Sequence, residues 1–179
     1  HGLGHIGPVI MHFGSDETAM KPLTGKTALD VGCGAGQELP PFVSGGARGI
    51  GVDLASDAAA VGRRLFEQAG HAGRVAFVRS AAERLPFAAS SFDVVICRLA
   101  LPYTDNRQAL GEMGRVLHPA GTLLLKIHHA LYYVSKLSQG VLRANASSAV
   151  HAARVLASGV LYHLIGSQVR NRVLTGETF

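Results

Sequence analysis

The feature that most constrains the fold is a glycine-rich turn that follows a short apolar run near the start of the chain. Residues 27–31 read Thr-Ala-Leu-Asp-Val, and alternate glycines follow at Gly32, Gly34 and Gly36. The run predicts a buried strand, and glycines let a ligand approach the backbone where a side chain would collide. We expect a helix to open directly after the turn, with its free N–H groups and positive dipole end facing the ligand. This order of elements is typical of a pocket for a nucleoside-bearing cofactor.

Two carboxylates near the turn decide between cofactors. A phosphate-binding loop is excluded, because Lys26 precedes the strand instead of following it. A dinucleotide site needs Gly-x-Gly-x-x-Gly, but Gly36 falls one residue early, and Asp30 would repel a pyrophosphate. A sulfonium cofactor carries a positive charge and an amino group, which suit Asp30. Asp53, at the end of the next predicted strand, has two acceptor oxygens for the two ribose hydroxyls.

Strand and helix signals alternate through the first two thirds of the chain. Apolar runs predict further strands at 49–53, 74–78, 92–97 and 121–127. Helical spacing is expected from Ser56, as N-cap, to Gly70, and again over 105–117, with His118 in the loop that follows. Strands that are apolar on both faces predict an α/β fold: a Rossmann-like, doubly wound, mostly parallel sheet with helices on both faces. Ligands of such sheets bind at the carboxyl ends of the strands.

Three segments are expected along the chain. Residues 1–24 are predicted to be a lead-in with one short helical piece near Asp16 to Met20, and 25–128 the cofactor-binding core. Residues 129–179 carry helical periodicity and are expected to form a tail or cap, which covers the cofactor cleft, carries substrate contacts or only packs on the sheet. A start at His1 and an abrupt end favour a fragment that lacks the final strands of such a fold.

Four segments resemble, in order, the motifs of class I S-adenosylmethionine-dependent methyltransferases. Residues 29–37 look like the first motif, and 51–54 resemble the second. Residues 81–95 are similar to the third-strand and fourth-strand signature of the group often labelled type 11, and 110–125 to its approach to the fifth strand. The resemblance covers 25–127. It implies S-adenosylmethionine as the methyl donor and S-adenosylhomocysteine as the product. No metal is expected, because the histidines lack ligand spacing and the two cysteines are far apart in the sequence.

The resemblance also implies a role for the residues around the turn. Asp30, Gly32 and Gly34 would line the methionine part of the cofactor. Asp53 would hold the ribose, and Leu54 would pack on the adenine. The predicted cofactor contacts are together Asp30, Gly32, Cys33, Gly34, Gly36, Asp53, Leu54, Ala81, Ala82, Glu83 and Arg98.

One position departs from the family. Relatives usually carry Asp where this chain has Ala81, and that Asp accepts a hydrogen bond from the adenine amino group. Backbone groups of Ala82, or the side chain of Glu83, are the expected substitutes. Losing one such bond costs about 1 kcal/mol, which weakens binding without abolishing it.

Candidates for acceptor chemistry follow the fourth and fifth strands. They are Arg98, Tyr103 and His128, whose neighbour His129 would face the opposite side of a strand. The sequence Leu101-Pro102-Tyr103 lacks the Asn/Asp-Pro-Pro-aromatic pattern, which argues against methylation of an exocyclic base amine. We therefore expect a small-molecule or lipid-like acceptor, with RNA or protein as the alternative. An NAD-dependent oxidoreductase and a non-catalytic partner subunit are the alternatives from other classes.

Composition narrows the partners further. The net charge of +5 permits a nucleic-acid partner without indicating one, and nothing specifies an oligomeric state. Two cysteines, Cys33 and Cys97, make no disulfide framework and are expected to be buried thiols in the cytoplasm. The histidines lack metal-ligand spacing. The apolar stretch 155–165 is too short to span a bilayer, which takes about 20 residues.

Overall fold

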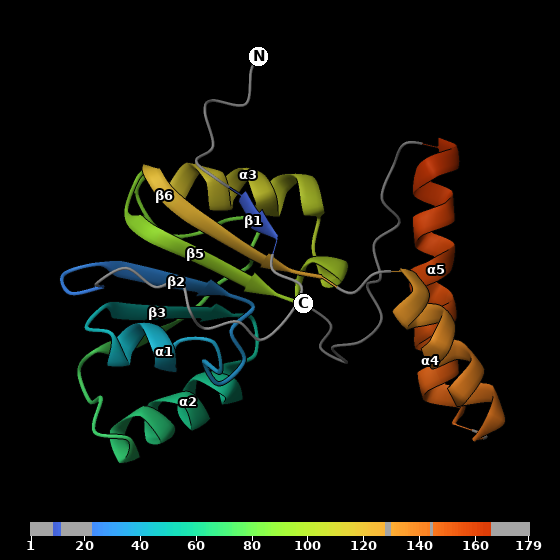
Figure 1. Ribbon diagram of the computed structural model, residues 1–179, viewed down its shortest axis with the longest axis horizontal. Coiled ribbons are helices and arrows are strands. Elements are labelled where there is room, and N and C mark those ends of the chain that lie inside the picture. The colour runs from blue at the N-terminus through green and yellow to red at the C-terminus, as the bar shows by residue number, and fades with distance from the viewer. Residues whose placement is uncertain (1–8, 12–22, 128–129, 144, 166–179) are drawn as a thin grey trace. The chain divides into compact units, whose positions relative to one another are not determined.

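The computed structural model describes residues 9–11, 23–127, 130–143 and 145–165 (Figure 1). The chain divides into two compact units. Unit 1 comprises residues 1–101 and 107–126, and unit 2 comprises residues 102–106 and 127–179. The predicted short helix near Asp16 to Met20 lies outside the described residues, as do His128 and His129.

Within its described residues, unit 1 contains a six-stranded sheet in which every pairing is parallel and the strand order is β1-β6-β5-β2-β3-β4. The strands are β1 Val9–Met11, β2 Thr27–Val31, β3 Arg48–Asp53, β4 Val75–Arg79, β5 Phe92–Arg98 and β6 Leu117–Lys126. From β2 the chain winds outward through β3 and β4, then returns to the other side of β2 with β5. This reversal makes the carboxyl ends of β2 and β5 the topological switch point, beside which ligands of such sheets bind.

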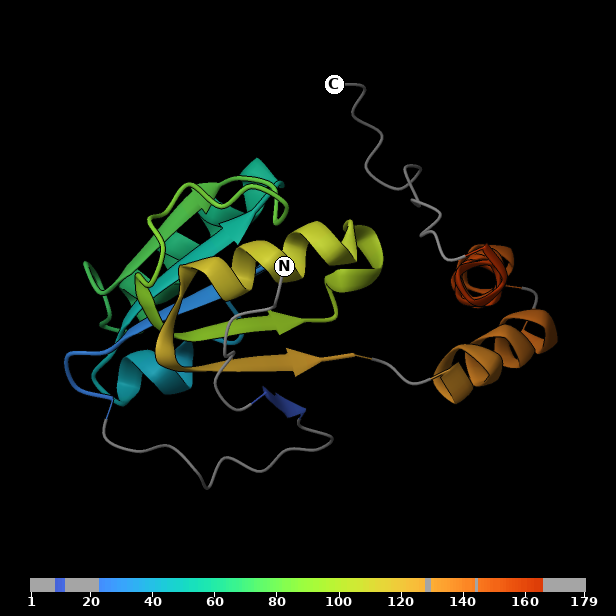
Figure 2. The same cartoon turned by 90° about the horizontal axis from the view of Figure 1, so that it is seen from above.

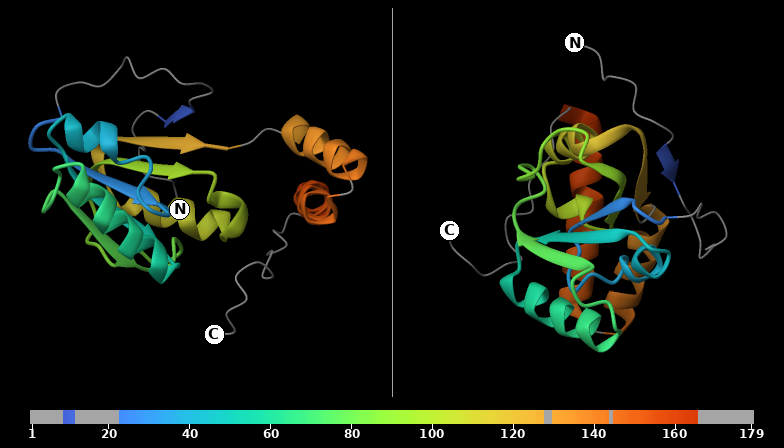
Figure 3. Two further views of the ribbon diagram at one scale, coloured as in Figure 1. Left: turned by 90° about the horizontal axis from the view of Figure 1, so that it is seen from below. Right: turned by 90° about the vertical axis from the view of Figure 1, so that its left-hand side faces the viewer.

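Helices cover both faces of this sheet (Figures 1 and 3). They are α1 Pro40–Ser44 and α2 Ser56–Gln68 on one face, and α3 Asn106–Val116 on the other. Side chains alternate along β2, so Leu29 packs in the core beneath α3, whereas Ala28 packs with Phe42 of α1 and Phe66 of α2. Met113 of α3 is fully buried. The predicted doubly wound fold is confirmed, because apolar residues on both faces of a strand require two covering layers.

The strand β1 was not predicted. Val9 to Met11 pair in parallel with Leu123 to Leu125 of β6, and Figure 2 shows β1 beside β6 at the edge of the sheet. Three residues are too few for a periodic pattern to emerge, so the sequence indicated only a lead-in there. The other five strands lie at or near the predicted positions.

The expected helix directly after the glycine turn is wrong. Residues between Cys33 and Leu39 form turns, closed by bonds from Gly36 N–H to the Cys33 carbonyl and from Leu39 N–H to the Gly36 carbonyl. Helix α1 begins only at Pro40 and spans five residues. A helix opening at the turn would place Pro40 and Pro41 in its interior, where each lacks an N–H and collides with the preceding turn.

Two smaller expectations also fail at element ends. Ser56 is the first helical residue of α2, and the N-cap is Ala55, without a side-chain cap. His118 lies within β6 instead of a loop, where its ring nitrogen Nδ1 accepts from Ala120 N–H at 3.3 Å. The register of β5 against β6 shifts between Phe92 and Val94, and this irregularity extends β6 back to Leu117.

Unit 2 contains the helices α4 Ala130–Leu142 and α5 Ala146–Ile165, as the helical periodicity predicted. They approach closely at Gly140, where an added Cβ would lie 2.8 Å from the backbone nitrogen of Ala149. The Asn145 side chain caps α5 by accepting from Ser148 N–H at 3.1 Å. None of the helices described is long and apolar enough to cross a membrane.

Candidate cofactor site

The glycine turn lies at the carboxyl end of β2 and packs closely against its neighbours. At Gly32, φ is +72° and an added Cβ would lie 2.3 Å from the Cβ of Ala100, after β5. At Gly36, φ is +82° and the same atom would lie 3.0 Å from the rings of Phe66 and Phe77. Only glycine combines this backbone conformation with this crowding, so the turn sits tightly between β5 and α2.

Asp53, at the end of β3, is fixed by the turn. Its Oδ2 accepts from Gly34 N–H at 2.8 Å, and its Oδ1 accepts from Ala55 N–H at 2.9 Å. The adjacent Val52 carbonyl accepts from Gly32 N–H and Cys33 N–H. Each Asp53 oxygen keeps a further lone pair, so the half-buried carboxylate offers two oriented acceptors toward solvent.

Asp30 is the second carboxylate of the site and, unlike Asp53, is almost fully buried. Its side chain is 1% exposed, and neither oxygen has a hydrogen-bond partner among the described residues. Burial above all, with the negative charges of Glu38 and Asp53, raises the pKa of Asp30 to about 7, against the opposing effects of the Arg98 charge and of the nearby Glu38 backbone. An unpaired buried carboxylate is costly, so this position favours a ligand that brings a cation.

Arg98, predicted as both a cofactor contact and a catalytic candidate, ends β5. Its Nε lies 2.5 Å from Oε1 of Glu38, and both side chains are partly exposed. Sequence reasoning missed Glu38, because the two partners are far apart in the sequence and meet only where the turn returns to the end of β5.

A small pocket lies at the carboxyl ends of β3 and β4, beside the glycine turn. Its lining includes Gly34, Asp53, Ala59, Val78 and Arg79. The predicted adenine contacts follow directly on the two strands: Leu54, which is 45% exposed, after β3, and Ala81, Ala82 and Glu83 after β4.

Phe77 of β4 lines the pocket at the ends of β3 and β4 and packs closely against the glycine turn at Gly36. The sequence analysis did not predict this role for Phe77. An added Cβ at Gly36, Gly51 or Gly62 would lie within about 3 Å of the Phe77 ring. Glycines inside a strand and a helix were the available signal, because they often mark a close approach.

Both cysteines are buried free thiols, as predicted. Burial raises the pKa of Cys33 to about 12, with a further contribution from the negative charges of Asp30 and Asp53. Burial likewise raises the pKa of Cys97 to about 11. Neither thiol is a nucleophile at neutral pH, since the thiolate is the reactive form.

The remaining acceptor candidates, Tyr103 and His128, do not belong to unit 1. Tyr103 belongs to unit 2, where its ring stacks on His151 at 6.0 Å between centroids. His128 lies outside the described residues. In the part of the chain that the structure describes, no three His, Cys, Asp or Glu side chains are grouped to hold a metal ion.

A doubly wound sheet with a glycine turn and two strand-end carboxylates defines an α/β domain for a nucleoside-bearing cofactor. Residues 29–125 match the family described as "Methyltransferase domain". This match covers more than half of the chain, which therefore belongs to that family, in agreement with the resemblance to class I S-adenosylmethionine-dependent methyltransferases.

Individual relatives agree with this assignment. The chain is 33% identical over 125 residues to the ubiquinone biosynthesis O-methyltransferase of Azorhizobium caulinodans, covering 69% of this chain and 49% of that protein. It is 33% identical over 98 residues to sterol 4-C-methyltransferase strm-1 of Caenorhabditis elegans, covering 54% and 29%. The crystal structure of YcgJ from Bacillus subtilis superposes with a TM-score of 0.57 at 33% identity, covering 64% and 51%. The chain thus spans half or less of the length of these two curated relatives.

Proposed function

We propose that this chain is the cofactor-binding part of an S-adenosylmethionine-dependent methyltransferase whose acceptor is a small, lipid-like molecule. The observation that carries the proposal is the pair of carboxylates at the turn. Asp30 is buried without a partner among the described residues, and Asp53 presents two fixed acceptors. A cofactor with an ammonium group at one end and a ribose diol beside it satisfies both.

The fit at Asp30 is electrostatic. The amino group of the cofactor would donate to the Asp30 carboxylate, which receives no other hydrogen bond from the described residues. A cation in contact with a carboxylate favours its charged form and lowers its pKa, so binding would release the proton that burial retains on Asp30 near neutral pH.

The fit at Asp53 also separates two cofactor classes. A dinucleotide fold presents the backbone N–H groups of its turn to the pyrophosphate, but the N–H of Gly34 already donates to the Asp53 carboxylate. A ribose diol needs acceptors, and Asp53 supplies two. A nicotinamide dinucleotide also carries ribose diols, so it is the occupied Gly34 N–H that argues for the sulfonium cofactor over this alternative from another enzyme class.

The chemistry that the cofactor supplies is an activated methyl group with its own leaving group. The residues of the chain then have to align donor and acceptor and avoid competing with the acceptor. The raised pKa of Cys33 and Cys97 keeps both thiols protonated, so no thiolate beside the turn competes for the methyl group.

The names of two relatives support the acceptor class. One is named for ubiquinone biosynthesis and the other as a sterol methyltransferase, and quinones of this kind and sterols are both lipid-like small molecules. An RNA or protein acceptor is the alternative within the same enzyme class.

Calorimetric titration tests the donor. We expect the chain to bind S-adenosylhomocysteine but not NAD. Asp53→Ala should weaken S-adenosylhomocysteine binding at least about tenfold, because charge-assisted bonds to two hydroxyls are lost. Binding of NAD alone would refute the donor assignment, and binding of neither would favour a non-catalytic partner subunit. Transfer of a labelled methyl group to a quinone-type phenol, compared with RNA and with protein, tests the acceptor.

A further inference from the structure

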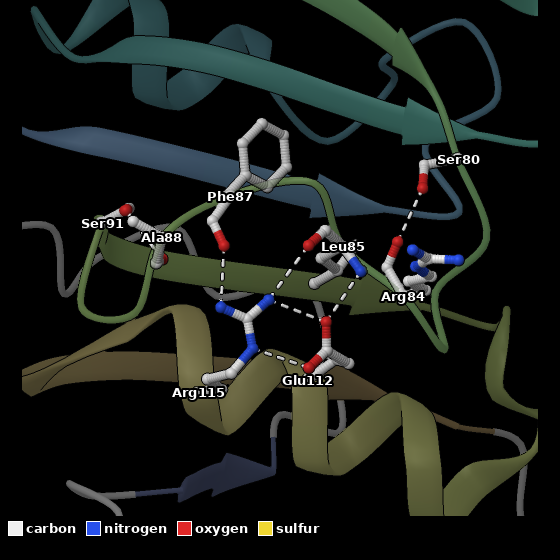
Figure 4. Close-up of polar contacts among 8 residues, drawn as sticks. All are labelled: Ser80, Arg84, Leu85, Phe87, Ala88, Ser91, Glu112 and Arg115. Atoms are coloured by element: carbon white, nitrogen blue, oxygen red, sulfur yellow. Dashed lines mark hydrogen bonds and ion pairs between the residues drawn. The ribbon is translucent and has the colours of Figure 1, made fainter.

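An ion pair on α3 fastens the loop that follows β4 (Figure 4). Glu112 and Arg115 lie three residues apart on one face of the helix. Nε of Arg115 donates to Oε1 of Glu112 at 2.6 Å, and Nη2 donates to Oε2 at 2.8 Å. These hydrogen bonds lower the pKa of Glu112. The two planar groups therefore meet in the bidentate geometry that is the strongest form of such a pair.

The same two side chains also bind the backbone of the loop. Nη1 of Arg115 donates to the carbonyl of Phe87 at 2.7 Å, and Nη2 donates to the carbonyl of Leu85 at 3.0 Å. Oε2 of Glu112 accepts from Leu85 N–H at 2.8 Å. Three backbone groups at two loop positions are thus held by one helix. An exposed ion pair by itself contributes little to the stability of a fold, but this one also fixes the path of a second chain segment.

The loop leads from this anchor to the site. Leu85 and Ala82 are buried in the core under α3. At the β4 end, Ser80 N–H donates to the carbonyl of Asp53 at 3.1 Å, and Ser80 Oγ donates to the carbonyl of Arg84 at 2.8 Å. Residues 80–84 are therefore held at one end by the backbone of Asp53 and at the other by the ion pair.

Ala81 makes this loop decisive for adenine recognition. A side-chain acceptor at this position would tolerate a small displacement of the backbone, because its rotamers can adjust. With Ala81, the expected substitutes are the loop backbone at Ala82 and the side chain of Glu83, and a backbone acceptor is placed only as accurately as the loop itself. We propose that Glu112 and Arg115 are positioning residues for adenine recognition, acting through the backbone of residues 80–84. The inference rests on the proposed donor.

The test compares two ligands that differ at one edge of the base. S-adenosylhomocysteine carries the adenine amino group there, whereas S-inosylhomocysteine has a carbonyl oxygen in its place and a proton on the adjacent ring nitrogen. The parent chain should prefer the first about tenfold, the equivalent of one hydrogen bond. Arg115→Met should bind the two within about twofold of each other, because the loop acceptors are displaced. Arg107→Met removes an exposed arginine from the same helix and should keep the parent preference.

Conservative variants separate positioning from folding. Glu112→Gln keeps an acceptor for Leu85 N–H but loses the negative charge. Arg115→Lys keeps the positive charge but loses the planar guanidinium group that donates to several acceptors at once. Both should show an intermediate preference while circular dichroism shows a folded chain. A parent that does not distinguish the ligands, or a folded Arg115→Met chain that keeps the full preference or weakens both ligands equally, would overturn the positioning role. A parent that binds neither ligand would instead refute the proposed donor.

Discussion

Asp30→Asn is expected to stabilise the ligand-free chain, and increasingly so as pH rises. The pKa of Asp30 moves from its ordinary value of 3.8 to about 7 on folding. At about 1.4 kcal/mol for each pKa unit, ionising this residue costs the folded state up to about 4 kcal/mol. Because the folded pKa is the higher one, the stabilising contribution of the protonated carboxyl is complete below about pH 4 and is lost by about pH 7.

The size of the effect is measured as the change with pH in the difference between the free energies of unfolding of Asp30→Asn and the parent. Asn cannot ionise, so its contribution is constant with pH, and any cost of burying its amide is the same at each pH. Between about pH 5 and about pH 8, the free energy of unfolding of Asp30→Asn relative to the parent should rise by about 2–3 kcal/mol. Urea denaturation followed by circular dichroism suits this chain, which has no tryptophan.

Asp57→Asn makes the same chemical change at an exposed position in the first turn of α2 and serves as the control. A difference between Asp30→Asn and the parent that stays flat across this range, or that shrinks with pH, would refute the argument that burial protonates Asp30. With S-adenosylhomocysteine added, the parent should gain stability by mass action, whereas Asp30→Asn should gain little.

Two further predictions concern the surroundings of Asp30 and the turn. The affinity of the parent for S-adenosylhomocysteine should rise with pH through about 7. Glu38→Gln should move the midpoint of that rise to lower pH, because Glu38 contributes to raising the pKa of Asp30. A calorimetric pH series in which the midpoint of Glu38→Gln is unchanged or higher would contradict this prediction. Gly32→Ala should destabilise the chain by about 1–3 kcal/mol more than Gly25→Ala. Both positions have positive φ, but the new Cβ meets Ala100 only at Gly32. Equal melting temperatures for the two variants would therefore exclude crowding against Ala100 as the cause of the loss of stability.

Most of the sheet was predictable because its strands are buried on both faces. The run Thr27 to Val31 coincides with β2, since a short apolar run ended by glycine has few alternatives. Strand β1 escaped prediction because its three residues pair with Leu123 to Leu125, far along the chain. The start of α1 was also missed, although the Pro40-Pro41 pair carried the signal against an earlier helix.

The site was predictable only where its residues form local patterns. The glycine turn and Asp53 are recognisable from spacing, and so was the departure at Ala81. Glu38 was not, because its ion pair with Arg98 depends on how the turn folds back. The spacing of Glu112 and Arg115 suggests a pair on one helix face, but not that both side chains hold the loop after β4.

The sequence by itself determined the family, the order of the strands along the chain and the residues of the turn, because glycine geometry and apolar runs act over a few neighbouring residues. The tertiary structure decided what the two carboxylates do. Asp53 receives two backbone N–H groups and stays oriented at the surface, whereas Asp30 is buried without a partner among the described residues and holds its proton up to about pH 7. Desolvation and charge depend on everything packed around a group, so two aspartates at similar strand ends acquire different chemistry only in the folded chain.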